Sequence, residues 1–310
     1  MARLVRPQNL CKATCPAGEH EIYCCGARVR ISKKGGVEVL TEPPVDYCPL
    51  HESLYGTKNI DKESVRRSVE MKVARAGFCC PNRAFDAEPI VAYGASEMMR
   101  IWLEKRLIDC AIVVCEGAGT VIATDGELVQ SIGARLTGIA KTSPIPRIIK
   151  HIEARAGVVL DKTTGRIDQV EGVKRAFDLG LRCVAVSVAG FQAKAISEIR
   201  KMESRLNMNA LIFSVCNTCV TTMAVQHISK ADIACASASK ILRNEIGSKA
   251  VLQLGVTIPV YALTDKGKRF ILAYLAEFDH KLVAFRTGKL PYLSEGKGPR
   301  LRSCARNQKP

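Results

Sequence analysis

The sequence predicts an α/β fold with a doubly wound, mostly parallel sheet and a small, β-rich, cysteine-rich N-terminal appendage. Beyond about residue 108, short apolar runs rich in β-branched residues alternate with segments of helical length, a rhythm typical of βαβ units. Runs such as AIVVC at 111–115 are apolar throughout, as in strands buried on both faces. The 310 residues, of which 47% are hydrophobic, can bury a full core.

Residues 1–50 form the predicted appendage, an irregular arm followed by a β-hairpin over residues 21–40. The alternating Arg-Val-Arg-Ile pattern and a Lys-Lys-Gly-Gly turn indicate the hairpin. Cys24 and Cys25 are adjacent in its first strand. Because neighbouring residues of a strand point to opposite faces, we do not expect these two thiols to bind one metal together.

Residues 51–285 form the predicted core domain, and the basic, Gly- and Pro-containing stretch 286–310 is predicted to be a loosely ordered tail. The predicted strands are 111–115, 157–161, 183–188, 210–215, 231–235 and 258–263. The predicted helices are 61–76, 95–107, one starting at Thr124 or Asp125, 147–155, 169–179, 193–206, 221–229, 239–246 and 265–278. Caps and breakers such as Gly77 set these limits.

The formal net charge of +16 bears on the partners of the chain. Basic residues are spread along the sequence, with a local excess only beyond residue 286, and aromatic residues are 5% of the chain with one tryptophan. Nucleic-acid binding is therefore disfavoured, and an acidic protein partner or an anionic cofactor is expected instead. No apolar run reaches the length of a membrane span. Without a secretory signal the protein is expected in the cytoplasm.

The loop after the strand at 111–115 is the first candidate site, because ligands in parallel sheets bind beyond the carboxyl ends of strands. It is expected to lead from the strand into a helix. Backbone N–H groups of Gly117, Gly119 and Thr120 could hold a phosphate or carboxylate, with Arg135 nearby in sequence. The alternative is a tight turn without a ligand. Neither the ATP-binding nor the NAD-binding glycine pattern is present.

Four carboxylates are candidates for acid–base chemistry: Glu116, Asp125, Asp168 and Glu171. Carboxylates at such positions are more often helix caps and ion-pair partners. Cys216 and Cys219 form the only C-x2-C motif. Its place between a strand and a helix matches that of a redox pair, although two packed thiols would look the same.

Several segments, taken together, resemble the methanogenesis marker protein 8 family over about residues 20–275. The matching segments are 47–50 (YCPL), 94–97 (GASE), 115–122 (CEGAGTVI), 128–136 (LVQSIGARL), 143–146 (SPIP), 167–173 (IDQVEGV), 234–237 (ACAS) and 258–264 (IPVYALT). The resemblance implies a role connected with methyl-coenzyme M reductase, in its maturation or activation or in an associated redox process. The N-terminal arm, the Cys24-Cys25 pair and the basic tail look like additions to the family pattern.

The fourteen cysteines suggest the chemistry of such a role. Without export they are expected to be reduced thiols or metal ligands, and thiolates prefer iron–sulfur clusters and zinc. The region shared with the family points to Cys48, one of Cys79 or Cys80, Cys115 and Cys235, and we expect Cys48, Cys79, Cys115 and Cys235 to be the ligands. Weaker candidates are Cys80, Cys11, Cys15, Cys216 and Cys219.

Two function classes follow. The first is a cysteine-ligated metal or iron–sulfur accessory or assembly factor. The second is an enzyme that acts on a small anionic substrate at the glycine loop.

Overall fold

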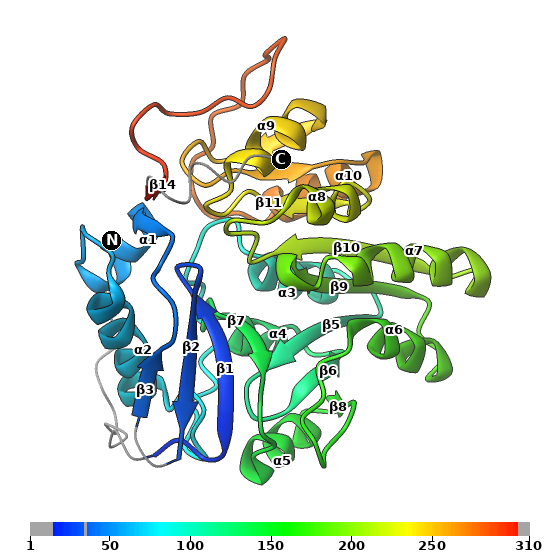
Figure 1. The fold of residues 1–310 in the computed structure, drawn as a ribbon. Helices are drawn as coiled ribbons and strands as arrows, with labels where there is room; N and C mark the ends of the chain where they lie inside the picture. Colours follow the sequence, from blue (N-terminus) through cyan, green and yellow to red (C-terminus); the bar gives the residue numbers. More distant parts are fainter. Residues whose placement is uncertain (1–14, 34–35, 303–310) are drawn as a thin grey trace.

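The computed structural model describes residues 15–33 and 36–302 and confirms the predicted α/β fold (Figure 1). Its main sheet has eight strands in the order β12-β13-β11-β10-β9-β5-β6-β8. These strands are β5 (Cys110–Cys115), β6 (Gly119–Ala123), β8 (Val158–Val159), β9 (Cys183–Ala189), β10 (Asn209–Val215), β11 (Ile233–Cys235), β12 (Leu252–Leu254) and β13 (Val260–Ala262).

Six of the eight strands run in one direction. β5, β9, β10 and β11 pair in parallel, and β6 and β13 pair antiparallel with their neighbours. β8 pairs antiparallel with β6, and β12 pairs antiparallel with β13. β8 and β12 therefore run in the same direction as the four parallel strands. Two expectations are corrected here: β13 is not parallel to its neighbour, and the glycine loop leads into β6 rather than into a helix. Three residues between β5 and β6 allow a hairpin but not a parallel crossover.

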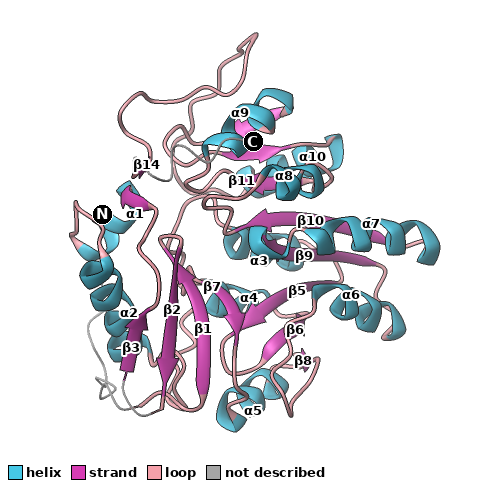
Figure 2. Cartoon of the chain, in the orientation of Figure 1, coloured by secondary structure: helices cyan, strands magenta, loops and turns pink. Residues whose placement is uncertain are grey.

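Helices cover both faces of the sheet, which makes it doubly wound (Figure 2). One face packs against α3 (Ala95–Glu104), α4 (Gly126–Gly133), α5 (Pro146–Ala154) and α10 (Asp265–Leu275). The other packs against α6 (Gln169–Asp178), α7 (Lys194–Leu206), α8 (Thr222–Ile228) and α9 (Lys240–Glu245). Short 3-10 turns, η1 (Gly190–Gln192) and η2 (Gly247–Lys249), complete these connections. Among the described residues, no helix is long and apolar enough to cross a membrane.

A second, four-stranded sheet in the order β3-β2-β1-β7 forms what we call the N-terminal layer together with α2 (Lys62–Ala76). Its strands are β1 (Glu19–Cys24), β2 (Ala27–Ser32), β3 (Gly36–Val39) and β7 (Gly138–Lys141). The predicted hairpin is thus three strands, because the chain also turns at Cys25 and Gly26. α2 begins and ends as expected: the Asp61 carboxylate accepts the N–H of Ser64 at 2.7 Å, and Gly77 closes the helix with a φ of 61°.

The N-terminal layer lies at the edge of the main sheet where the parallel strands end, as the arrowhead of β10 shows (Figure 1). β7 joins the layer from within the core sequence, by pairing with β1. α1 (Pro49–Tyr55) follows β4 (Val45–Tyr47), which pairs with β14 (Arg300–Leu301) from the far end of the chain. Ligand sites are expected at such an edge.

Candidate metal centre

The four predicted ligands meet in two pairs rather than as one set. Cys79 and Cys115 act electrostatically on each other, and Cys48 acts on Cys235. No group of three or more His, Cys, Asp or Glu side chains in residues 15–33 and 36–302 is arranged to hold one metal ion. The two pairs therefore need separate description.

The first pair is fully buried against an ion pair. Arg83 donates from Nε to Glu116 Oε1 at 2.6 Å, and both side chains are almost inaccessible to solvent. Burial, together with the Glu116 carboxylate, raises the pKa of both Cys79 and Cys115. Neutral, buried thiols of this kind pack as small apolar groups. Arg83 also donates to the carbonyl oxygen of Ser131 at 3.1 Å, so the pair ties the loop after α2 to α4 and to the end of β5.

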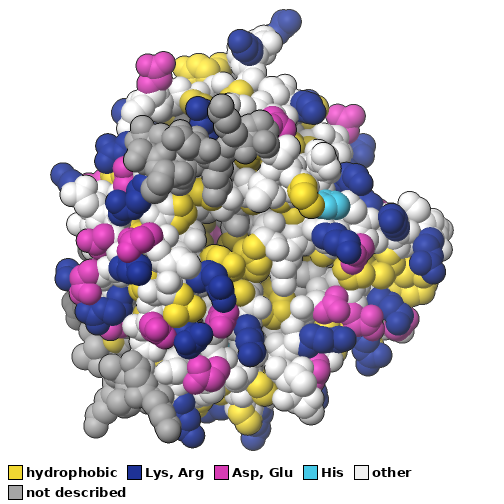
Figure 3. Space-filling view, viewed as in Figure 1, with side chains coloured by type: hydrophobic (Ala, Val, Ile, Leu, Met, Phe, Trp, Pro, Cys, Tyr) yellow, Lys and Arg dark blue, Asp and Glu magenta, His cyan; other side chains and the backbone are white. Residues whose placement is uncertain are grey.

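The second pair belongs to a larger group, the thiol cluster, which we define as Cys24, Cys25, Cys48, Cys216 and Cys235. Its members come from the β1–β2 turn, the start of α1 and the carboxyl ends of β10 and β11. Electrostatic influences on the pKa values relate Cys24 to Cys25 and Cys48, Cys48 to Cys235, and Cys235 to Cys216. All but Cys24 are partly exposed. Figure 3 shows a hollow between the N-terminal layer and the main sheet. Side chains coloured as hydrophobic, a class that includes Cys, line this hollow.

Cys24 and Cys25 form a vicinal thiol pair, contrary to the expectation that they point to opposite faces. Cys25 lies in the turn after β1 with a φ of 50°, so the strand alternation does not apply to it. The interaction between the two thiols is the main cause that lowers the pKa of Cys24. The same interaction, with burial, raises the pKa of Cys25 well above its usual value. One negative charge is thus shared by two thiols.

Lys72 of α2 brings a positive charge to the thiol cluster. Its Nζ donates to Thr137 Oγ1 at 2.6 Å, and its charge acts on Cys24, Cys25 and Cys216. Burial lowers the pKa of this half-buried ammonium, but Tyr55 and the thiols raise it above the usual value. Among the described residues no carboxylate forms an ion pair with Lys72. Its counter-charge in the metal-free protein is therefore the thiolate of the vicinal pair.

The backbone around the thiol cluster is held in an uncommon conformation. Cys25, Cys216 and Ser237 have φ values of 50°, 52° and 47°, in the left-handed region that costs a non-glycine residue of order 1 kcal/mol. Ser237 lies beside Cys235, with 3.8 Å between its Oγ and the thiol sulfur. Asn217, buried next to Cys216, fixes the loop by donating to the Cys235 carbonyl oxygen at 2.8 Å.

His51 lies three residues after Cys48 and 5% of it is exposed. Neither ring nitrogen has a hydrogen-bond partner of ordinary geometry, although the Thr57 backbone is close enough to raise the pKa slightly. Burial and the charge of Lys72 lower the pKa to about 4. A neutral imidazole without firm partners has the chemistry of a metal ligand, but among the described residues His51 does not form a metal-binding group with the cysteines.

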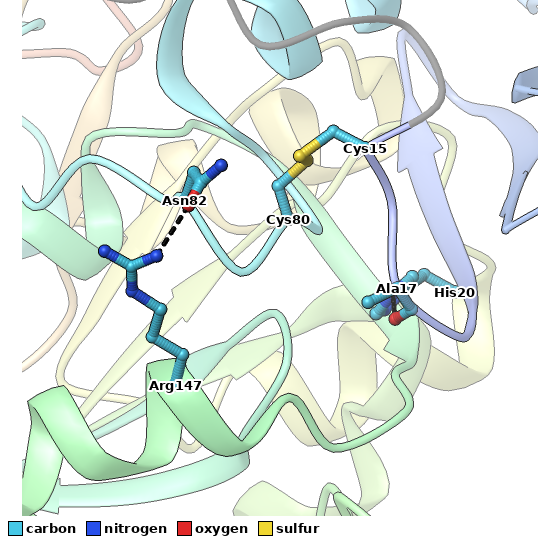
Figure 4. Close-up of a disulfide and its surroundings, with 6 residues drawn as sticks. All are labelled: Cys15, Ala17, His20, Cys80, Asn82 and Arg147. Carbon is cyan, nitrogen blue, oxygen red and sulfur yellow. Dashed lines mark hydrogen bonds between the residues drawn. A yellow bond between two sulfur atoms is a disulfide. The ribbon is translucent and has the colours of Figure 1, made fainter.

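The weaker candidate ligands lie outside the thiol cluster, apart from Cys216. Cys80 is joined to Cys15 in a disulfide that ties the start of the described chain to the loop after α2 (Figure 4). Cys11 lies outside the described residues. Cys219, the partner of Cys216 in the C-x2-C motif, also has a positive φ, and burial raises its pKa. Burial raises the pKa of Cys216 as well, so neither thiol of the motif has the lowered pKa of an activated redox thiol.

The glycine loop is closed in this structure. The N–H of Gly117 donates to Thr142 Oγ1 at 2.7 Å, that of Ala118 to the Cys115 carbonyl, and that of Thr120 to the Arg166 carbonyl at 3.0 Å. Arg135 donates to the carbonyl oxygen of Ala84, and burial lowers its pKa to about 10. These three loop amides are already used within the protein, so the loop serves here as a packed hairpin.

Replacing Gly119 by Ala should destabilise the protein more than replacing Gly56 by Ala. Both glycines have a left-handed φ, 76° and 69°, so both variants carry a similar backbone strain of about 1 kcal/mol. A methyl group at Gly119 would overlap the carbonyl oxygens of Gly165 and Arg166, whereas none would be met at Gly56. Urea unfolding measures the difference, and equal losses of free energy would contradict the close packing of this loop.

The remaining carboxylate candidates are caps and ion-pair partners. Asp125 caps α4 and pairs with Arg155 at 2.6 Å, and Asp168 caps α6 by accepting the N–H of Glu171 at 2.9 Å. Glu171 itself pairs with Lys174 at 3.6 Å. The structure gives these carboxylates stabilising contacts, and only Glu116 lies beside a thiol.

Comparison with known proteins places this fold and its cysteines in a family. A family model described as an uncharacterized protein conserved in archaea (DUF2099) matches residues 20–276. The chain belongs to this family. An uncharacterized protein of Methanocaldococcus jannaschii, MJ0054, is 36% identical over 279 residues, which cover 89% of this chain and 96% of the relative. The family match includes every member of the thiol cluster and Lys72, whereas Cys11, Cys15 and the basic tail lie outside it.

Proposed function

We propose that the chain binds an iron–sulfur cluster or zinc through the thiol cluster and acts as an accessory or assembly factor. The observation that carries this proposal is the charge of Lys72, a half-buried ammonium that has no carboxylate partner in the described chain and acts on Cys24, Cys25 and Cys216. Four thiolates around zinc or a four-iron cluster give a net negative charge, which would neutralise it. Such a negatively charged centre is favoured beside a partly buried ammonium.

The site differs from the four cysteines expected from the sequence. Cys48 and Cys235 stay as ligands, and Cys24, Cys25 and Cys216 take the place of Cys79 and Cys115. A single tetrahedral zinc needs thiolate sulfurs about 3.8 Å apart, from Zn–S bonds of about 2.3 Å. The described thiols are not so arranged. A four-iron cluster spreads its ligands over a larger cage, so the separate segments of the thiol cluster suit a cluster better than one ion.

The finer role rests on resemblance. The likeness to methanogenesis marker protein 8 supports a function in maturation or activation of methyl-coenzyme M reductase. The charge of +16 favours an acidic protein partner, although Lys and Arg are spread over the visible face rather than gathered in one patch (Figure 3). Anaerobic affinity capture with the full chain tests this role. Recovery of no acidic metalloenzyme component would count against it.

Protection from alkylation tests the proposed site. After anaerobic loading with iron and sulfide, or with zinc alone, the cysteines of the thiol cluster should react with iodoacetamide far more slowly than in metal-free protein. Cys183 is the control, because this partly exposed thiol lies at the opposite end of β9 from the thiol cluster. Mass spectrometry locates the labels. Protection of Cys183 alone, or of no cysteine, would contradict the proposal.

The metal-free vicinal pair should be alkylated at an unusually low pH. The interaction with Cys25 and the charge of Lys72 lower the pKa of Cys24 to about 6, and the reactive form is the thiolate. The labelling rate of the pair should therefore rise as pH increases through about 6. Replacing Lys72 by Met removes the positive charge and should move this rise to higher pH. An unchanged profile in the Lys72→Met variant would contradict the assigned role of Lys72.

A further inference from the structure

A second feature of the edge of the main sheet is a cavity of about 250 Å³ next to α9. The segment 293–300 forms one wall, and Val256, Thr257 and Arg243 form the others. Figure 1 shows this segment, coloured orange to red, passing beside α9 before it reaches β14. The volume is just below the range of small-molecule pockets, which begins at about 300 Å³.

Specific hydrogen bonds hold the wall in place. The N–H of Ser294 donates to the Val256 carbonyl at 3.1 Å, and Tyr292 N–H donates to Gln253 Oε1 at 3.0 Å. At Gly298 a side chain would lie 3.0 Å from the Thr257 carbonyl oxygen and 3.4 Å from Arg243 Nη1. Glycine at this position lets the wall approach the guanidinium closely. The cavity is therefore a defined feature rather than the space beneath a loose loop.

The charges of the cavity are unequal. The Arg243 side chain makes only a 3.4 Å hydrogen bond, to the Ser239 carbonyl of its own helix, and no carboxylate of the described chain pairs with it. Arg300 forms an ion pair with Asp46, with 3.5 Å between Nε and Oδ1, and its guanidinium lies over the Tyr47 ring. Glu295 is the one acidic residue in the lining. Arg243 thus keeps an unused planar fork of donors, the group that binds carboxylates and phosphates in bidentate fashion.

We propose that this cavity binds a small molecule that carries a carboxylate or phosphate and a short apolar part, with Arg243 holding the anionic end. Val256, Leu293 and Pro299 supply the apolar surface for the rest of the ligand. The proposal rests on this cavity alone and does not depend on metal binding by the thiol cluster. The cavity nevertheless lies close to it, because β14 pairs with β4, which ends next to Cys48.

Calorimetric titration of the full chain with inorganic phosphate and with butyrate tests the proposal. Wild-type protein should bind at least one probe in the millimolar range, and the tighter probe identifies the anionic group. Arg243→Met should weaken binding at least about tenfold, equivalent to about 1.4 kcal/mol. Arg243→Lys, which keeps the charge but loses the fork, should fall between. Glu295→Gln should tighten binding, because it removes the opposing charge.

Arg269→Met serves as the control, because Arg269 lies on α10, outside the cavity lining, and should bind like wild type. Thermal denaturation of each variant checks that it is folded. No binding of either probe to wild-type protein would overturn the proposal. So would an Arg243→Met variant that is folded and binds both probes with unchanged affinity.

Discussion

Replacing Cys24 and Cys25 together by Ser is expected to reduce bound metal to background. Wild-type protein, reconstituted under anaerobic conditions, should hold about four iron and four sulfide per chain, or about one zinc if the site is mononuclear. In the vicinal pair the pKa of Cys24 is lowered in part by the charge of Lys72, and serine hydroxyls are poor ligands for soft metals. Metal and acid-labile sulfide analysis, with the visible absorbance of the cluster, measures the loss.

The matched control for this experiment is Cys79→Ser with Cys115→Ser, the pair predicted from sequence but buried beside Glu116. This control should keep its metal if it folds, and Cys183→Ser should keep it in any case. If the Cys24→Ser/Cys25→Ser variant keeps its full metal content and the Cys79→Ser/Cys115→Ser variant loses it, the proposed site is wrong. Cys79 and Cys115 would then be ligands, as expected from the sequence.

Breaking the Arg83–Glu116 ion pair is expected to cost about 3–5 kcal/mol of stability, because removal of one partner leaves the other charge buried and unpaired. Both side chains are almost fully inaccessible, and Arg83 also holds carbonyl groups at the end of α4. Glu116→Gln and Arg83→Met should each lower the free energy of unfolding by this amount. Urea denaturation followed by circular dichroism measures it.

Arg66→Met is the comparison variant, because its ion pairs with Glu63 and Glu70 are exposed on α2 and should contribute less than about 1 kcal/mol. The double variant Arg83→Met with Glu116→Leu should regain part of the lost stability, since it leaves no unpaired charge. Equal losses for the buried and the exposed pair would contradict the structural role of Arg83.

The α/β architecture could be predicted because its signal is local. Apolar runs such as 111–115 and the helical segments between them depend on burial and capping, which short stretches of sequence encode. The direction of a strand could not be predicted in this way, because a strand buried on both faces has the same apolar pattern whether it runs parallel or antiparallel to its neighbour. Only the three-residue link between β5 and β6 carries the antiparallel signal, and its glycines are equally typical of a turn from a strand into a helix.

The sequence and the structure point to different sets of candidate ligands. Cys48 and Cys235 belong to both sets, but the thiols around them depend on long-range packing of the N-terminal layer against the ends of β10 and β11, which spacing does not reveal. One local signal was present at the vicinal pair. Gly26 follows Cys25 directly, and glycine within a strand pattern indicates a turn or bulge. A turn there places both thiols at one end of the hairpin. Lys72 carried no sequence signal, because it lies on an ordinary amphipathic helix.

Anomalous diffraction at the iron or zinc absorption edge, from crystals grown after anaerobic reconstitution, tests metal binding by the thiol cluster most directly. We predict one strong peak bounded by Cys24, Cys25, Cys48, Cys216 and Cys235, on the side that faces Lys72. A peak beside Cys79 and Cys115, or the absence of any peak in protein that is folded and loaded, would contradict the assignment.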